Sequence, residues 1–385
     1  MSNASPPPAQ VYEADLSAPV WHTFGQKRRL YLPAGNLVAL HYAIEFFVWR
    51  IWQRWLMQLL LAIKVTRVIK IGNESWQSLN QADSLAKQLA CKFNTPSESK
   101  IVTSIRNGSF GPFQKTSLLA MDESGQAVFY LKISCSKSAD KMIEAESSWL
   151  TRLSEIDPIM RNVPELLDNG ETLEGRKFIS TTVSAYLGST FVFGLAHRNF
   201  LASLGHATAQ FRHYRDSADF KYMAEELSAL STILGQEVHA MLENALHEVD
   251  SGIGNLQIPL ILVHRDFAPW NIKWRKSEIY VFDWEYAEDG GNPVCDFFHF
   301  HLIQRALSKW RKPTPRHIRL LLAQALQYLH STYPNVDWTP KLVRGLLTSY
   351  LINLILFYVR SGMLFNASHP VLFTYLLLLR NRERW

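Results

Sequence analysis

The sequence predicts a bilobal α+β protein, in which a small antiparallel-sheet lobe precedes a large, mainly helical lobe. Three observations lead to this fold class. Short runs rich in β-branched and aromatic residues, separated by glycine-containing turns, occupy residues 101–134. From about residue 201 to the end the pattern is helical, apart from two short apolar runs. A Leu- and Trp-rich segment at 36–71 predicts one or two helices before the sheet, and thus an N-terminal helical extension.

The chain has 385 residues, which suits two or three domains, because a domain takes roughly 150 residues. Proline and small polar residues at 1–18 predict a disordered tail. The polar stretch KFNTPSESK predicts a linker just before residue 100. We therefore expect the helical extension at 19–99, a small lobe at 100–180 and a large lobe at 181–385.

The composition excludes several classes of protein. Apolar residues make up 47% and charged residues 19%, which is typical of globular proteins. The net charge of +6 is spread over many segments and forms no basic stripe, so we expect no nucleic-acid partner. Three distant cysteines without metal-ligand spacing argue against disulfide scaffolds and zinc fingers, and favour a reducing compartment. The first residues lack the pattern of a secretory signal, so a cytoplasmic protein is expected.

Two apolar segments, 37–71 and 361–379, are poor candidates for membrane spans, because charged or polar residues interrupt both. The first segment has two alternatives. It packs on the rest of the protein, or it lies in a membrane interface with its arginines outward. The second alternative would place the protein at the inner face of the cell membrane as a peripheral protein. We expect no obligate protein partner.

The small lobe is predicted to contain a glycine-containing turn between its first two strands. Strands are expected at 101–106, 114–121 and 126–134, and a helix at 140–153. The turn comprises Asn107, Gly108, Ser109, Phe110 and Gly111. Its glycines would let backbone N–H groups approach phosphate oxygens, although two glycines in a hairpin can equally form a plain turn.

A lone lysine, Lys132, interrupts the apolar strand AVFYLKI. If it points inward it needs a partner or a phosphate, because burying an unpaired charge is costly. On an edge strand it would instead point to solvent. Two glutamates of the following helix compete as partners, Glu144 and Glu146. Helical spacing favours Glu146, which lies four residues after Met142 and four before Leu150, on the apolar face.

The most informative segment reads LILVHRDFAPWNIKWRKSEIYVFDWEYA. Short apolar strands are expected at 260–263 and 279–282, and their matching lengths predict that they pair with each other. The loop after the first strand carries Asp266 and Asn271, and Asp283 follows the second. We expect these three side chains to converge at one end of that hairpin.

These three side chains offer only oxygen ligands, which Mg²⁺ prefers. Asp266 lies five residues before Asn271, beyond a turn that Pro269 stiffens. It can therefore face an acceptor hydroxyl while Asn271 and Asp283 hold the metal. Phosphoryl transfer needs this division of labour, in which one carboxylate orients the acceptor and other groups fix metal and triphosphate.

H-x-D-x-x-x-x-N, with the Asp of D-W-E 12 residues after its Asn, resembles the aminoglycoside phosphotransferase/choline kinase family, which has the protein-kinase-like fold. The downstream GGNPVCDFFHF is similar to the family segment in which a further Asp, here Asp296, supports the catalytic loop. The resemblance implies ATP and Mg²⁺ as cofactors and a small-molecule hydroxyl as acceptor. It implies Asp266 as the catalytic residue, and Asn271 and Asp283 as metal ligands.

The order of the small-lobe features, a glycine loop, a strand lysine and a helix glutamate, is also similar to this family. The resemblance implies that Lys132 contacts the α- and β-phosphates and pairs with the helix glutamate, for which spacing selects Glu146. ATP would lie with its adenine against the main chain of the apolar connection 178–184. The candidate contacts there are Ser180, Thr181 and Thr182.

Other polar residues of this region are assigned supporting roles. We expect His264 to brace the catalytic loop through a hydrogen bond. Glu285 either contacts the acceptor or a second metal, or belongs to the start of a helix. His299 and His301 alternate with aromatic residues after Asp296, which predicts core positions or positions behind the site.

Acidic residues are scarce beyond Asp296, where residues 297–385 contain only Asp337 and Glu383. The large lobe therefore offers few carboxylates to bind a polycationic acceptor, and we expect a sugar or a sugar-containing envelope precursor. A choline/ethanolamine-type or aminoglycoside kinase is the alternative enzyme, since aromatic side chains alone can hold a quaternary ammonium. A nucleotide-binding pseudokinase scaffold is the non-enzyme alternative, although every catalytic position holds a competent residue.

Overall fold

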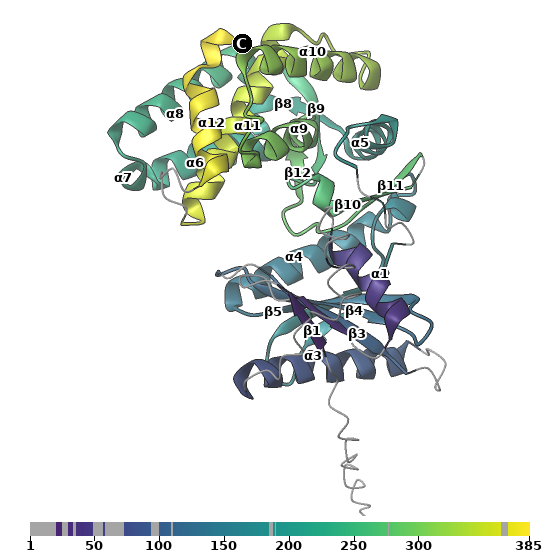
Figure 1. The fold of residues 1–385 in the computed structure, drawn as a ribbon. Coiled ribbons are helices and arrows are strands. Elements are labelled where there is room, and N and C mark those ends of the chain that lie inside the picture. The colour runs from purple at the N-terminus through teal and green to yellow at the C-terminus, as the bar shows by residue number, and fades with distance from the viewer. Residues whose placement is uncertain are drawn as a thin grey trace, which may run out of the picture. The chain divides into compact units, whose positions relative to one another are not determined.

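A computed structural model describes most of the chain (Figure 1). The described residues are 21–24, 30–33, 36–48, 57, 73–93, 100–108, 111–184, 188, 190–275, 277–362 and 369–385. They fall into two compact units. The first lies within residues 1–109 and 118–128, and the second within 110–117 and 129–385. The tail expected at 1–18 lies outside the described residues.

The first unit combines three strands with helices. Strand β1 (Trp21–Phe24) pairs antiparallel with β2 (Leu30–Pro33), and β2 pairs with β3 (Val102–Asn107). Helices α1 (Leu37–Phe47) and α3 (Asn73–Lys92) pack against these strands. The expectation of helices alone before residue 100 is therefore wrong for β1 and β2. Four-residue runs are too short for periodicity to identify, and β2 is defined by pairing with β3.

Helix α1 is the described beginning of the segment 37–71. The side chain of Asn36 caps its start by accepting a hydrogen bond from the Ala39 N–H at 3.0 Å. Its apolar residues Ala43 and Ile44 are fully buried within the unit. Apart from Met57, residues 49–71 lie outside the described residues, so the interfacial alternative for this segment stays a prediction.

The second unit begins with the sheet that carries Lys132. Strand β5 (Ala127–Ser134) enters this unit at Phe129, and β7 (Lys177–Thr181) lies antiparallel between β5 and β6 (Leu166–Glu171). Strand β4 (Lys115–Met121) runs from the second unit into the first. Helix α4 (Lys137–Leu153) packs against β6 and β7. The strands and the helix expected between 101 and 153 are confirmed.

The rest of the second unit is mainly helical, as predicted, and helix α11 forms its centre. It packs against α6, α8, α9, α10 and α12. The bounds are α5 (Leu195–Thr208), α6 (Ala218–Ala229), α7 (Ser231–Leu234), α8 (Gln236–Val249), α9 (Cys295–Leu307), α10 (Pro315–Thr332), α11 (Pro340–Arg360) and α12 (Pro370–Arg380). Short helical turns occupy Met160–Asn162, Tyr214–Asp216, Asp250–Gly254, Pro269–Asn271 and Arg382–Arg384.

Helix α11 is also the one helix of the described chain that is long and apolar enough to cross a membrane. However, 72% of its most apolar window is buried inside the protein. The central helix of a large helical lobe has the same composition, because neighbours cover it on all sides.

Two small sheets frame the loop that carries Asp266. Strand β9 (Gln257–Val263) pairs with β8 (Gln210–His213) and with β12 (Glu288–Gly291), whereas β10 (Ile272–Arg275) pairs with β11 (Glu278–Val281). The predicted pairing of 260–263 with 279–282 is therefore wrong. The segment directly before β11 is its nearer partner, because the two strands close as a hairpin with a two-residue loop.

Candidate active site

The loop between β9 and β10 is held by Asp296, which lies in the first turn of α9. Its buried carboxylate accepts hydrogen bonds from the backbone N–H groups of His264, at 2.8 Å, and Arg265, at 2.9 Å. Burial raises the pKa of Asp296, against these hydrogen bonds. Arg265 has φ +66°, a left-handed conformation that costs energy in a residue with a Cβ atom. Asp296 therefore stabilises a strained turn, in the place that the resemblance implies.

His264 joins this loop to the end of β11. Its Nε2 donates to the carbonyl oxygen of Phe282 at 3.1 Å, and its Nδ1 accepts from the backbone N–H of Asp266 at 3.2 Å. This pattern requires the ring proton on Nε2. The imidazole is fully buried and packs on Trp284, with ring centroids 4.5 Å apart. Both nitrogens are used internally, so His264 braces the loop.

The Asp266 carboxylate is held through both of its oxygens. Its Oδ2 accepts from Asn271 Nδ2 at 2.7 Å, and its Oδ1 accepts from His299 Nε2 at 3.1 Å. Asn271 Nδ2 also donates to the Asp266 backbone oxygen at 3.0 Å. The Asp266 side chain remains 29% exposed. It is therefore oriented and still accessible to an acceptor hydroxyl.

His299 lies behind the site, which is one of its two predicted positions, and the structure adds its direct contact with Asp266. A sequence signal for it exists. His299 lies three residues after Asp296, so both side chains are on one face of α9, and Asp296 already holds the loop that carries Asp266. His301 is mostly buried beside Phe297, with ring centroids 4.8 Å apart, which agrees with a core position.

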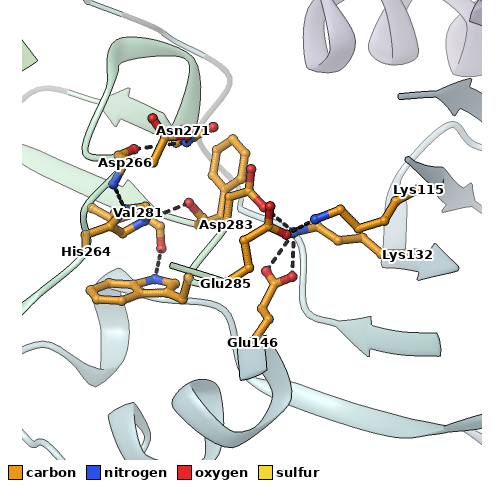
Figure 2. A network of polar contacts seen from close by, with 11 residues as sticks. Lys115, Lys132, Glu146, His264, Asp266, Asn271, Val281, Asp283 and Glu285 are labelled. Atoms are coloured by element: carbon orange, nitrogen blue, oxygen red, sulfur yellow. Dashed lines mark hydrogen bonds and ion pairs between the residues drawn. The ribbon is translucent and has the colours of Figure 1, made fainter. Parts of the chain in front are cut away.

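Lys132 lies between two carboxylates, as Figure 2 shows. Its Nζ is 2.7 Å from both oxygens of Glu146 and 2.7 Å from Asp283 Oδ1. Lys132 is 8% exposed, so the alternative of a solvent-facing lysine is wrong. Glu146 contacts Lys132, as the helical spacing predicts, and Glu144 instead pairs with Lys177 at 3.2 Å.

The electrostatics of this contact fix the charges of its members. Burial opposes the charge of Lys132, but Asp283 and Glu146 outweigh it and raise the pKa of Lys132 above its ordinary value. Burial would likewise raise the pKa of Asp283, but the nearby Lys132 and Lys115 hold it well below its usual range. An ammonium and a carboxylate therefore face each other at neutral pH.

Lys115 is a site residue that the sequence did not indicate. It is the first residue of β4 and forms an ion pair with Glu285, and burial lowers its pKa. A lysine that opens a strand has no distinguishing pattern. The same contact shows that Glu285, 9% exposed, faces a lysine. Glu146, Asp283 and Glu285 each offer an oxygen within 4.8 Å of the other two.

Asn271 and Asp283 lie at adjacent ends of the β10–β11 hairpin, where the Phe282 N–H donates to the Asn271 backbone oxygen at 3.1 Å. Asn271 uses its amide nitrogen for Asp266, and Lys132 contacts Oδ1 of Asp283. The amide oxygen of Asn271 and the second oxygen of Asp283 are thus hard donors suited to a divalent cation. The residues present fit Mg²⁺.

The predicted glycine loop is described only in part. Asn107 ends β3 and Gly108 follows it in the first unit, whereas Ser109 and Phe110 lie outside the described residues. Gly111 has φ +154°, which favours glycine, with open space where a Cβ would lie. A phosphate-binding role for this loop stays a prediction.

The connection 178–184 needs a correction. Ser180 and Thr181 lie inside β7. This strand is paired on one edge with β5 and on the other with β6, so their main-chain groups are used for hydrogen bonds within the sheet. Thr182 donates its N–H to Glu165 O at 2.9 Å. A contact of this connection with an adenine stays a prediction.

A family model described as the phosphotransferase enzyme family matches residues 119–338, more than half of the chain. The chain belongs to this family. The predicted family and the bilobal, protein-kinase-like fold with its N-terminal extension are confirmed. The protein is a phosphotransferase that acts on a hydroxyl of a small molecule. No curated protein matches the chain significantly.

Two solved structures with TM-scores of 0.50 and 0.51 share the fold at low identity. A candidate fructosamine-3-kinase from Thermobifida fusca YX-ER1 is 15% identical, with a TM-score of 0.51, over 78% of this chain and 99% of that one. A thermostable mutant of an aminoglycoside phosphotransferase, in ternary complex with ADP and hygromycin B, is 16% identical, with a TM-score of 0.50, over 78% and 98%. A choline/ethanolamine kinase family protein from Mesorhizobium loti is 12% identical, with a TM-score of 0.49, over 78% and 94%.

Proposed function

We propose that the protein transfers the γ-phosphoryl group of ATP, with Mg²⁺, to a hydroxyl of a sugar or of a sugar-containing envelope precursor. One observation carries the proposal. A buried lysine held by two carboxylates belongs to the same network of polar contacts as an aspartate that an amide and an imidazole orient (Figure 2). The aminoglycoside phosphotransferase that shares the fold was crystallised with ADP, which supports a nucleotide as the phosphoryl donor.

Each residue of the site has a role in this reaction. Lys132 contacts the α- and β-phosphates, and Glu146 keeps its ammonium in place. Asn271 and Asp283 hold Mg²⁺, which neutralises charge on the triphosphate when it is bound. Asp266 accepts a hydrogen bond from the acceptor hydroxyl, orients its oxygen toward the γ-phosphorus and takes up its proton.

The acceptor class follows from the side chains around Asp266. Tyr286 and Tyr358 are partly exposed and lie close enough for the Asp266 charge to affect them, and burial raises the pKa of both well above the ordinary tyrosine value. They therefore stay neutral. Aromatic rings and neutral hydroxyls suit a sugar, whereas a polycation would need carboxylates, which are scarce beyond Asp296. The same rings favour a quaternary ammonium as the second candidate.

A parallel screen tests the proposal. ATP consumption is measured with Mg²⁺ against sugars, amino alcohols and aminoglycosides, and the Asp266→Ala protein supplies the blank. We expect turnover above the blank with one or more sugars. Turnover only with an amino alcohol would select the choline/ethanolamine-type alternative. Stabilisation by Mg-ATP without turnover on any acceptor would contradict a kinase and favour a nucleotide-binding scaffold.

We also propose a cytoplasmic location with peripheral contact to the inner face of the membrane through segment 37–71. The arginines and tryptophans of that segment support it. Full-length protein is expected to float with liposomes that contain anionic lipid. If the folded protein stays at the bottom of the gradient, the membrane contact is refuted and the kinase proposal is untouched.

A further inference from the structure

Three helices of the second unit bring a chain of hydrogen-bonded side chains to the Asp266 carboxylate. His299 of α9 reaches Asp266 Oδ1 with its Nε2 at 3.1 Å. The hydroxyl of Tyr350, on α11, is 3.2 Å from His299 Nδ1. The hydroxyl of Tyr375, on α12, is 3.1 Å from the Tyr350 hydroxyl. The chain thus runs from α12 through α11 and α9 to the catalytic loop.

The direction of this chain is determined by its two ends. Asp266 accepts at Oδ1, so a ring proton lies on Nε2, and with this single ring proton Nδ1 accepts from Tyr350. The Tyr350 oxygen then accepts from the Tyr375 hydroxyl. Burial raises the pKa of both tyrosines well above the ordinary value, so both remain donors. Hydrogen bonds that point the same way strengthen one another.

This chain of hydrogen-bonded side chains lies in a buried, largely apolar environment. His299 and Tyr350 are 3% exposed and Tyr375 is fully buried, while the neighbours of His299 on α9 include Phe298 and Phe300. Polar groups in such a core cost free energy unless their hydrogen bonds are made. Here they are made, and the chain ends on the one carboxylate that faces the acceptor.

We propose that His299 is a positioning residue for Asp266, and that Tyr350 and Tyr375 act on catalysis through it. The inference rests on the proposed role of Asp266. Asn271 holds one carboxylate oxygen and His299 the other, which stops rotation of the carboxylate and leaves its remaining lone pairs for the acceptor hydroxyl. Tyr350 and Tyr375 lie beyond residue 338, where the family match ends.

Kinetics of two His299 variants test the proposal with the best acceptor from the screen. His299→Leu removes the donor, and His299→Gln keeps an N–H group near the position of Nε2. For His299→Leu we expect kcat to fall about 10- to 100-fold, because a misplaced catalytic group costs a rate of this order. Its affinity for AMP-PNP should not change, and His299→Gln should recover most of the lost rate.

Tyr350→Phe keeps the test valid if His299→Leu fails to fold. We expect a smaller loss of kcat with Tyr350→Phe, and the smallest with Tyr375→Phe. The matched control is Tyr214→Phe, which removes a buried hydroxyl that hydrogen-bonds Ser349, the neighbour of Tyr350 on α11. Equal losses in Tyr350→Phe and Tyr214→Phe, or losses that follow the melting temperature, would show a purely structural role and overturn the proposal.

A measurement without activity separates this inference from the proposed function. ¹⁵N NMR of the histidine rings in the wild-type protein should show the His299 ring proton on Nε2, assigned by comparison with His299→Gln. Asp266→Asn should change that signal. A proton on Nδ1 would overturn the chain even if the enzyme is active, and the expected tautomer would support it even if no acceptor is found.

Discussion

Asp266 and Asp283 lie on the two sides of the candidate active site, and their side chains are exposed to similar extents, 29% and 30%. They are nevertheless held in different ways. Hydrogen-bond donors hold Asp266, namely an amide and an imidazole. Opposite charge holds Asp283, through Lys132. The loop side is defined as His264, Asp266, Asn271, Asp296 and His299, and the lysine side as Lys115, Lys132, Glu146, Asp283 and Glu285.

This difference matches two different tasks. A carboxylate that must accept a proton from a hydroxyl needs orientation without a strong counter-charge, because a nearby cation would lower its basicity. A group that faces a triphosphate needs fixed positive charge that does not reorganise during the reaction. We therefore expect the loop side to determine kcat, and the lysine side to determine nucleotide binding and much of the local stability.

The largest effect is expected from Asp266→Ala. Removal of the group that takes up the acceptor proton should lower kcat by about 100- to 10,000-fold. Binding of AMP-PNP should change little, because Lys132 and Asp283 are untouched. Steady-state kinetics together with nucleotide titration check both parts. Wild-type kcat in this variant would contradict the division into two sides.

A substitution on the lysine side should affect nucleotide binding and stability, whereas Asp266→Ala affects kcat. In Glu146→Gln, Lys132 keeps only one carboxylate partner, so nucleotide affinity and stability should both fall. Breaking a buried ion pair costs up to about 3–5 kcal/mol, measured by chemical denaturation. Glu144→Gln is the matched control, since Glu144 lies two residues away on α4 and forms an exposed pair with Lys177. A control variant that loses as much stability would refute the special role of Glu146.

Acid should destabilise the core behind the loop side first. Burial lowers the pKa of His197 and of His301 to about 4, below the ordinary value of 6.5. Protonation therefore favours the unfolded state. The stability is full above pH 6.5 and is lost as pH falls toward 4, by at most about 3 kcal/mol for each histidine at 1.36 kcal/mol per unit.

Denaturation curves at several pH values measure this loss. His197→Phe should flatten the dependence between pH 6.5 and 4, because it removes one of the groups that titrate there. Asp283 does not contribute to this loss of stability, because its lowered pKa keeps it charged between pH 6.5 and 4. An unchanged slope in His197→Phe would show that other groups control the acid transition.

The smallest effect is expected from the helix cap under Glu146. Ser136 caps α4 by accepting from the Ala139 N–H at 3.1 Å. Ser136→Ala should cost about 1 kcal/mol and leave kcat nearly unchanged. Thr339→Ala removes the equivalent cap of α11, where Thr339 accepts from Leu342 N–H at 3.2 Å. If Ser136→Ala lowers nucleotide affinity and Thr339→Ala does not, the result supports the assignment of α4 to the lysine side.

Features that depend on local order in the chain were predictable. Runs of β-branched and aromatic residues between glycine-containing turns identified the strands of residues 101–134, and helical spacing separated Glu146 from Glu144. The motif H-x-D-x-x-x-x-N brought Asp266 and Asn271 together because a single short loop contains both.

Features that depend on distant partners were not predictable. The apolar run of β9 is equally compatible with β11 or with β12 as its neighbour, and only the fold selects β12. Lys115 has no pattern until Glu285 packs against it. His299 is one of several histidines among aromatic residues, and its role depends on Tyr350, which is 51 residues away in the chain.

The most direct test of the proposed phosphoryl-transfer site is a crystal structure of the full-length protein with AMP-PNP and with Mn²⁺ in place of Mg²⁺. The account predicts anomalous density for Mn²⁺ at the side-chain oxygens of Asn271 and Asp283, with Lys132 on the phosphates and Asp266 free of metal. Manganese bound elsewhere, or a triphosphate that leaves Lys132 untouched, would contradict it.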